Sequence, residues 1–97
     1  MNDESQQLSR LLSDQRSRWG RGERVRAEEY VRQHPGLLAD SERLLDLVYN
    51  EIYLREKAGD SPRLDEYLAR FPDLADSLRL QFEIHGAIQE EIGRAHV

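Results

Sequence analysis

Residues 64–74 read LDEYLARFPDL and residues 27–37 read AEEYVRQHPGL, so one phrase occurs twice in a chain of 97 residues. The apolar residues of the second copy recur at helical spacing and share one helix face: Leu64, Tyr67, Leu68 and Phe71. Pro72 follows directly, and a residue before proline is disfavoured in the α region, so a helix has to end at Phe71. The phrase therefore predicts a short amphipathic helix with a defined end.

Two interpretations of this repeated phrase compete. A helix of seven or eight residues is not stable alone and has to pack against longer helices. The phrases are either two tyrosine-centred docking sites or two buried structural joints, with the tyrosine hydroxyls at the rim. Because the whole apolar face coincides with the motif, we favour buried joints. The joint residues are Tyr30, Pro35, Tyr67, Phe71 and Pro72.

A shift of 37 positions aligns more than these two phrases. Within residues 18–37 the identical pairs that it brings together include six: Arg18 with Arg55, Gly22 with Gly59, Glu29 with Glu66, Tyr30 with Tyr67, Pro35 with Pro72, and Leu37 with Leu74. A period of this length is typical of helical repeats. We therefore expect a single domain over 1–97 with repeat units at about 8–44 and 45–81 and a partial third unit at 82–93.

Glycine and proline separate five segments with helical periodicity, at 4–19, 27–33, 41–57, 64–70 and 74–92. Asp40 or Ser41 is the expected N-cap of the third segment, and Gly59 lies just past its end. This third segment is apolar on most of its sides, so it should be central, flanked by the first and fifth. No alternating stretch reaches strand length. The prediction is an all-α, compact bundle of about five helices in the order long–short–long–short–long.

Composition limits the classes of protein that fit. The chain has no Cys, which excludes disulfides and thiolate sites, and its net charge is −5. The opening MNDESQQLSR lacks a signal pattern, and no apolar run is long enough to cross a membrane. A soluble, cytoplasmic protein without a membrane partner is the expectation.

The charge is distributed unevenly along the sequence. Six arginines but only two acidic residues lie between Arg10 and Arg26, whereas 7 basic and 13 acidic residues follow from Gly36 onward. This basic segment could bind an acidic protein, a phosphate group or the acidic part of a second copy. The plainer interpretation, which we favour, is a solvated face with local pairs such as Asp14 with Arg18. The candidate partner-binding residues are Arg16, Arg18, Arg21, Arg24 and Arg26.

No pattern in the sequence indicates catalysis. His34, His85 and His96 are isolated, without a second ligand at metal-site spacing. No nucleophile–base pattern appears among the many Asp, Glu and Ser residues. The GRGERV stretch at 20–25 lacks a third glycine and follows a helix instead of a strand, so it fails as a phosphate-binding loop. We expect no enzyme activity, no cofactor and no metal.

Taken together, the phrases resemble a segment that precedes the catalytic domain in many Hanks-type serine/threonine kinases of planctomycete bacteria. The resemblance covers roughly residues 11–88, and its most specific parts are the Arg-Trp…Gly-Glu…Glu-Tyr…His-Pro, Asp-Leu-Val-Tyr-Asn-Glu-Ile…Leu-Arg-Glu and Glu-Tyr-Leu…Phe-Pro…Leu…Gln-Phe-Glu runs. It implies a non-catalytic regulatory or adaptor domain of such a kinase or of a relative. No kinase active-site Lys or Asp is carried over to this sequence, and the resemblance supplies no binding residues.

The leading hypothesis is a protein–protein interaction module in kinase signalling, whose partner is a kinase domain, an effector or a second copy of the chain. The alternative is a small nucleic-acid- or transcription-associated binder that uses the Arg10–Arg26 face. An acidic total charge disfavours this alternative, because nucleic-acid binding needs a dominant positive field. A third possibility is a purely structural spacer or a death-fold-like adaptor.

Overall fold

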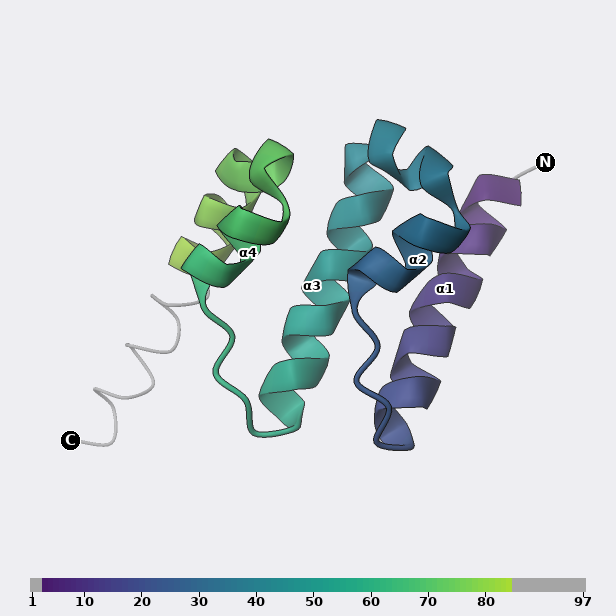
Figure 1. Cartoon of the computed structure of the whole chain (residues 1–97), viewed down its shortest axis with the longest axis horizontal. Helices are drawn as coiled ribbons and strands as arrows, with labels where there is room; N and C mark the ends of the chain where they lie inside the picture. The colour runs from purple at the N-terminus through teal and green to yellow at the C-terminus, as the bar shows by residue number, and fades with distance from the viewer. Residues whose placement is uncertain (1–2, 85–97) are drawn as a thin grey trace. The chain divides into compact units, whose positions relative to one another are not determined.

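Helices are the only regular secondary structure in residues 3–84, the part of the chain that the computed structural model describes (Figure 1). The helices are α1 (Asp3–Gly20), α2 (Ala27–Gln33), α3 (Ser41–Lys57) and α4 (Leu64–Arg70). Two short 3₁₀ helices, η1 (Pro35–Ala39) and η2 (Pro72–Leu74), follow α2 and α4. A further α-helix covers residues 75–84. The all-α prediction is confirmed.

The chain divides into two compact units, Met1–Ser61 and Pro62–Val97, and each is described by itself. In the first unit both α1 and α2 pack against α3, so α3 is central to that unit, as its apolar sequence indicates. The helix at 75–84 belongs to the second unit. Its predicted place beside α3 and the single domain over 1–97 therefore stay predictions.

The helix ends follow from local chemistry. The Asp40 carboxylate accepts a hydrogen bond from the Arg43 backbone N–H at 3.3 Å and caps α3, as expected. Gly22 and Gly59 follow the ends of α1 and α3 and have positive φ angles of 87° and 93°. This left-handed conformation suits glycine and ends each helix. The predicted end of the last helix at Gly93, together with His85 and His96, lies outside the described residues.

The short helices α2 and α4 have the same bounds and the same kinds of ends under the 37-residue shift. Arg26 and Arg63, a seventh identical pair that the sequence comparison overlooks, are the extended N-cap residues of α2 and α4. At the other ends, the His34 N–H donates to the Tyr30 carbonyl and the Phe71 N–H to the Tyr67 carbonyl, both at 2.8 Å. Each helix is then followed by a proline that begins a 3₁₀ helix.

These 3₁₀ helices correct one detail of the prediction. The sequence analysis treats Pro35 and Pro72 only as helix stops, but each also occupies the start of the next helical turn. Proline suits that position because its fixed φ angle is helical and it has no N–H to leave unpaired. Each joint therefore both ends one helix and begins another. Leu37 and Leu74 are buried directly after it.

The joint aromatics are buried, as the favoured interpretation requires. Tyr30, Tyr67 and Phe71 expose only 2%, 0% and 7% of their surface. In the first unit Tyr30 belongs to an apolar core with Leu11, Ala27, Leu37, Leu44, Leu47, Val48 and Ile52. In the second unit the Tyr67 and Phe82 rings pack with their centroids 6.1 Å apart.

Two buried polar side chains also join the helices of the first unit. Gln15 is fully buried on α1, and its amide donates to the Leu47 carbonyl of α3 at 3.0 Å. The buried Glu51 of α3 accepts the Ala27 backbone N–H at 2.8 Å. Because the N-cap Arg26 provides no side-chain cap, Glu51 satisfies a donor at the start of α2 from another helix. Within residues 3–84, no helix is long and apolar enough to cross a membrane.

Candidate functional site

The loop after α1 is held against the end of that helix by hydrogen bonds. The Glu23 N–H donates to the Arg18 carbonyl at 2.8 Å, which folds the chain back over the last turn of α1. The Trp19 indole N–H then donates to the Val25 carbonyl at 3.1 Å and fixes the loop against the helix. The Arg24 guanidinium lies 5.3 Å from the Trp19 ring centroid, a cation–π contact. The loop therefore holds its charged residues in defined positions.

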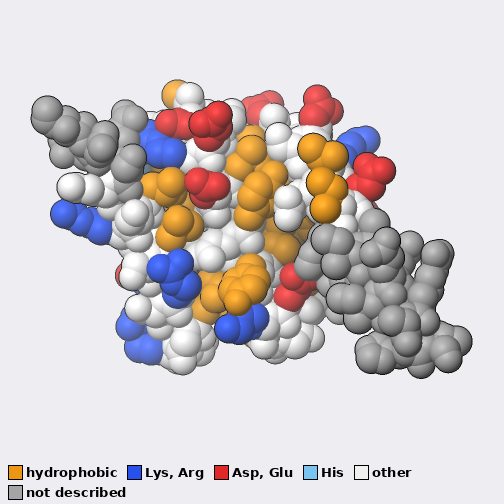
Figure 2. Space-filling model, turned by 180° about the vertical axis from the view of Figure 1, so that it is seen from behind, with side chains coloured by type: hydrophobic (Ala, Val, Ile, Leu, Met, Phe, Trp, Pro, Cys, Tyr) orange, Lys and Arg blue, Asp and Glu red, His pale blue; other side chains and the backbone are white. Residues whose placement is uncertain are grey.

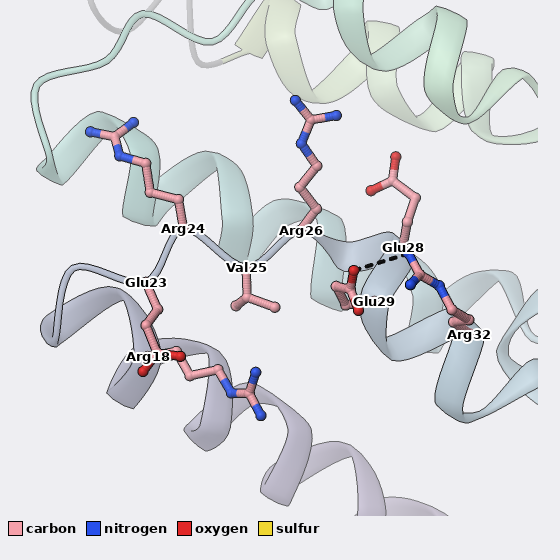
Figure 3. A pocket seen from close by; sticks show the side chains of 8 residues that line it. All are labelled: Arg18, Glu23, Arg24, Val25, Arg26, Glu28, Glu29 and Arg32. Carbon is pink, nitrogen blue, oxygen red and sulfur yellow. Dashed lines mark hydrogen bonds and ion pairs between the residues drawn. The ribbon is translucent and has the colours of Figure 1, made fainter.

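A groove of about 570 Å³ lies between this loop, the end of α1 and α2 (Figure 3). Its lining is mainly charged: Arg18, Glu23, Arg24, Val25, Arg26, Glu28, Glu29 and Arg32. In Figure 3 the Arg24 and Arg26 side chains extend from one side of the loop, and the Val25 side chain points to the opposite side, toward α1. Val25 lies buried at the floor of the groove, so the accessible lining consists mainly of charged side chains. We call this feature the arginine groove.

Most arginines of the groove are held by carboxylates of the same unit. Arg18 lies 3.0 Å from Asp14, Arg24 lies 2.7 Å from Asp60, and Arg32 lies 2.9 Å from Glu29. The pairing of Asp14 with Arg18 confirms the predicted local pair. Arg26 is exposed and forms no ion pair with any residue of the described part. It is therefore the groove's available cation.

The structure sorts the five predicted arginines into two groups. Arg18, Arg24 and Arg26 line the groove. Arg21 is exposed, is paired with Glu23 at 3.0 Å and does not line it. Arg16 is exposed on α1, away from the groove, and has no ion pair within residues 3–84. The predicted residues are thus brought together only in part.

Arg32 is a groove residue that the sequence analysis missed. It lies outside the Arg10–Arg26 segment and reaches the groove because α2 folds back beside the loop. A signal was present, because Arg32 follows Glu29 by three positions, the spacing of an ion pair on a helix. Charge runs along a sequence do not show which distant residues a turn brings together.

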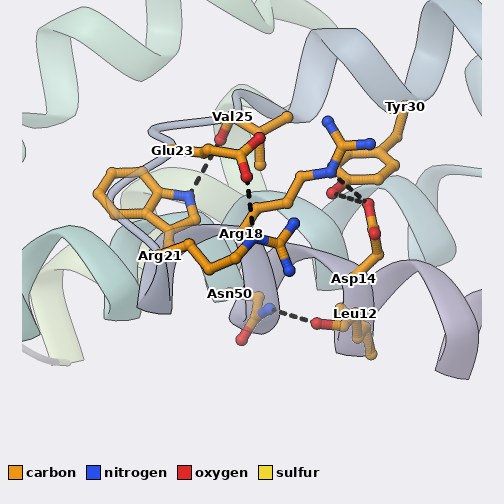
Figure 4. A network of polar contacts seen from close by, with 9 residues as sticks. Leu12, Asp14, Arg18, Arg21, Glu23, Val25, Tyr30 and Asn50 are labelled. Atoms are coloured by element: carbon orange, nitrogen blue, oxygen red, sulfur yellow. Dashed lines mark hydrogen bonds and ion pairs between the residues drawn. The ribbon is translucent and has the colours of Figure 1, made fainter.

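A network beneath the groove orients Arg18 (Figure 4). The Tyr30 hydroxyl donates to Asp14 Oδ2 at 2.7 Å, and the same oxygen faces Arg18 Nε at 3.0 Å. Burial raises the pKa of Tyr30 above its usual value, and the hydrogen bond to the Asp14 carboxylate raises it further. Tyr30 therefore stays a neutral donor. Tyr30, a joint residue in the first copy of the phrase, thus binds the same carboxylate as Arg18, which lines the groove.

Asp60 holds the loop from the other side. Its Oδ2 atom accepts from Arg24 Nη1 at 2.7 Å and from Arg55 Nε at 3.2 Å. The hydrogen bond from Arg55, and after it the one from Arg24, hold the pKa of the Asp60 carboxyl below its usual value of 3.8. Asp60 directly follows Gly59, so the turn after α3 positions the arginine of a different loop.

A second hollow lies beside three hydrogen-bonded side chains, those of Arg43, Gln7 and His34. Its lining residues are Gln6, Gln7, Arg10, Leu11 and His34. Arg43 Nη1 donates to Gln7 Oε1 at 3.2 Å, and Gln7 Nε2 lies 3.1 Å from His34 Nδ1. Because arginine can only donate, it directs the Gln7 amide nitrogen toward His34, whose Nδ1 has to accept. His34 therefore connects helices and shows no second metal-ligating group. No cluster of residues suited to a metal ion occurs in the described residues.

Comparison with known protein families, curated proteins and solved structures finds no match for this chain.

Proposed function

We propose that this chain is a non-catalytic protein–protein interaction module that binds an acidic segment of a partner in the arginine groove. The observation that carries the proposal is Arg26, an exposed cation without an ion pair in the described residues, at the rim of a defined groove. The Val25 side chain beneath it is buried and leaves little surface for a partner, so the proposed contact is mainly ionic. A segment that carries carboxylates fits this feature.

The cellular setting of this proposal comes from the resemblance of residues 11–88 to the module that precedes planctomycete serine/threonine kinase domains. On that basis the module acts in the cytoplasm as the regulatory or adaptor part of a kinase signalling protein. Its partner is then a kinase domain, an effector or a second copy. The all-helical fold of the described residues is compatible with this role.

The groove chemistry favours acidic protein segments over nucleic acid. Three of its four arginines already contact carboxylates, and Glu23, Glu28 and Glu29 also line it. A phosphate backbone would meet these carboxylates at close range, and its binding depends on many unpaired cations. A peptide that makes one new ion pair through Arg26 avoids most of this repulsion.

The test is fluorescence anisotropy with a labelled helical peptide that carries Glu and Leu residues one turn apart. The wild-type chain should bind it, and Arg26→Glu should weaken binding at least about tenfold because a rim cation becomes a like charge. Arg16→Glu is the matched control, because Arg16 is equally exposed and without an ion pair in the described part but lies outside the groove. It makes the same change in net charge.

Three outcomes contradict the proposal. They are no binding by the wild-type chain, equal loss in both variants, or equal binding of a peptide with Gln in place of Glu. Equal loss in both variants points to a general charge effect. In that case a gel shift with duplex DNA at about 50 mM and about 300 mM salt decides for the nucleic-acid alternative if binding is salt-sensitive.

A further inference from the structure

The second unit carries an exposed face that matches the chemistry of the arginine groove. Asp73, Asp76 and Glu83 are exposed and form no ion pair with any other described residue. Positions 76, 80 and 83 are spaced i, i+4 and i+7 and share one side of the helix at 75–84. Leu80, on that side, exposes 57% of its surface. We call Asp73, Asp76, Leu80 and Glu83 the acidic stripe.

The stripe combines exposed carboxylates with an exposed apolar side chain. Leu80 and Ile84, with 57% and 49% of their surfaces exposed, are two of the four large hydrophobic residues exposed in the described chain. Hydrophobic side chains reach the surface among charged ones on the face in Figure 2. Arg79 flanks the stripe, but three carboxylates still leave it an acidic surplus. Exposed carboxylates are what the groove is proposed to bind.

We infer that the acidic stripe of one copy binds the arginine groove of a second copy, so that the chain self-associates. The inference rests on the proposed function and names its partner. In the contact, Asp76 pairs with Arg26, and Glu83 lies on the same side of the helix as Asp76. Asp76, Glu83 and Arg26 are all exposed, and the charges of the two carboxylates are opposite to that of Arg26.

Each copy carries one groove and one stripe, which constrains the assembly. Two copies can exchange both contacts about a two-fold axis, or copies can join head to tail. Each contact is small, and small interfaces are weak and rely on charge for their specificity. Association should therefore appear only at high protein concentration and should decrease as salt screens the charges.

Sedimentation equilibrium of the full chain, from about 10 µM to about 500 µM, tests this inference. At about 50 mM salt the average mass should rise with concentration, and at about 500 mM salt the rise should be lost. Arg26→Glu and Asp76→Arg should each abolish the rise, because each brings like charges together. Arg16→Glu, outside both surfaces, should retain it.

Mixing the two disruptive variants gives the decisive measurement. In a mixed pair, the groove that carries the R26E change meets the stripe that carries the D76R change, so the charges at that contact are opposite again. An equimolar mixture of R26E and D76R should therefore regain association that neither variant has alone. General misfolding of the variants would not be rescued in this way, and circular dichroism of each variant checks its helicity.

The failures of the two proposals are distinguishable. A wild-type chain that stays monomeric at all concentrations, or a mixture without rescue, overturns self-association. If that chain still binds the acidic peptide through Arg26, the groove remains a binding site for another protein. If the wild-type chain binds neither the peptide nor itself, both proposals are wrong.

Discussion

The two joint tyrosines are both buried, and the contacts described for each involve different groups. The Tyr30 hydroxyl donates to Asp14 and so connects α2 with α1. The Tyr67 ring lies against Phe82 on one side, and the Arg70 guanidinium lies 4.7 Å from its centroid. The same position in the repeated phrase therefore places a buried tyrosine in each unit.

Truncation of the second joint should destabilise the protein strongly. Tyr67→Ala and Phe71→Ala should each cost about 3–5 kcal/mol in the free energy of unfolding, because each removes a buried aromatic ring and leaves a cavity. Urea denaturation followed by circular dichroism measures this cost. Tyr53→Ala is the matched control, because Tyr53 exposes 53% of its surface, and it should cost much less.

The opposite result would support the docking-site interpretation. If Tyr67→Ala and Tyr53→Ala have equal, small effects on unfolding while acidic-peptide binding falls for Tyr67→Ala, the phrase is a recognition motif. Phe71 supplies an independent check, because its 7% exposure leaves little surface for a partner to contact.

At the scale of the elements, two glycines end long helices by the same means. Gly22 and Gly59 have positive φ angles, and a Cβ atom added to either would meet no atom within 4 Å. Space is therefore not what requires glycine there. The requirement is the backbone conformation, which costs an L-residue with a side chain about 1 kcal/mol.

Gly22→Ala and Gly59→Ala should each lower the free energy of unfolding by about 1 kcal/mol. Gly20→Ala is the matched control, because Gly20 lies in the last turn of α1, does not have a positive φ angle and also has open space around its Cα. That change should be neutral or stabilising, since alanine favours helix over glycine. Thermal unfolding of the three variants compares them. Equal effects at Gly20 and Gly22 would contradict the conformational argument.

The helix bounds could be predicted from the sequence because glycine and proline mark them. The segments predicted at about 27–33, 41–57 and 64–70 coincide with α2, α3 and α4. The 3₁₀ helices were missed because a proline after a helix indicates the end of that helix, although proline also suits the first position of a new one. The Glu51 cap of α2 was missed because its partner is 24 residues away, and such a contact depends on packing rather than on local spacing.

The candidate site was predictable only in part for the same reason. Arg18, Arg24 and Arg26 were found because they cluster in the sequence, whereas Arg32 and the floor residue Val25 enter the groove through the fold. A charge count also could not separate Arg26 from Arg24. Their difference is the carboxylate of Asp60, which the turn after α3 brings to Arg24 and not to Arg26.

At the scale of the whole molecule, the basic and acidic segments are partly joined through that contact. Asp60 belongs to the acid-rich part of the sequence, and its carboxylate holds both Arg24 and Arg55 within the first unit. The Asp40 carboxyl is held in a similar way by Arg43, whose side-chain hydrogen bond lowers its pKa. The stability of the first unit should therefore depend on these carboxylates remaining ionised.

The pH dependence of unfolding tests the Asp60 contact. Because the pKa of Asp60 is lower in the folded protein than its usual value of 3.8, its contribution is complete above pH 3.8 and is lost as the pH falls through the lowered value. Asp60→Asn should therefore lower the melting temperature at pH 7, and the difference from wild type should shrink toward zero in acid. Asp73→Asn, which removes an exposed carboxylate without an ion pair in the described residues, is the control and should show little difference at either pH. Melting curves at closely spaced pH values measure both differences. A gap between wild type and Asp60→Asn that stays constant down to the lowest pH would show that the asparagine perturbs the turn itself, and that ionisation of Asp60 does not stabilise the loop that shapes the groove.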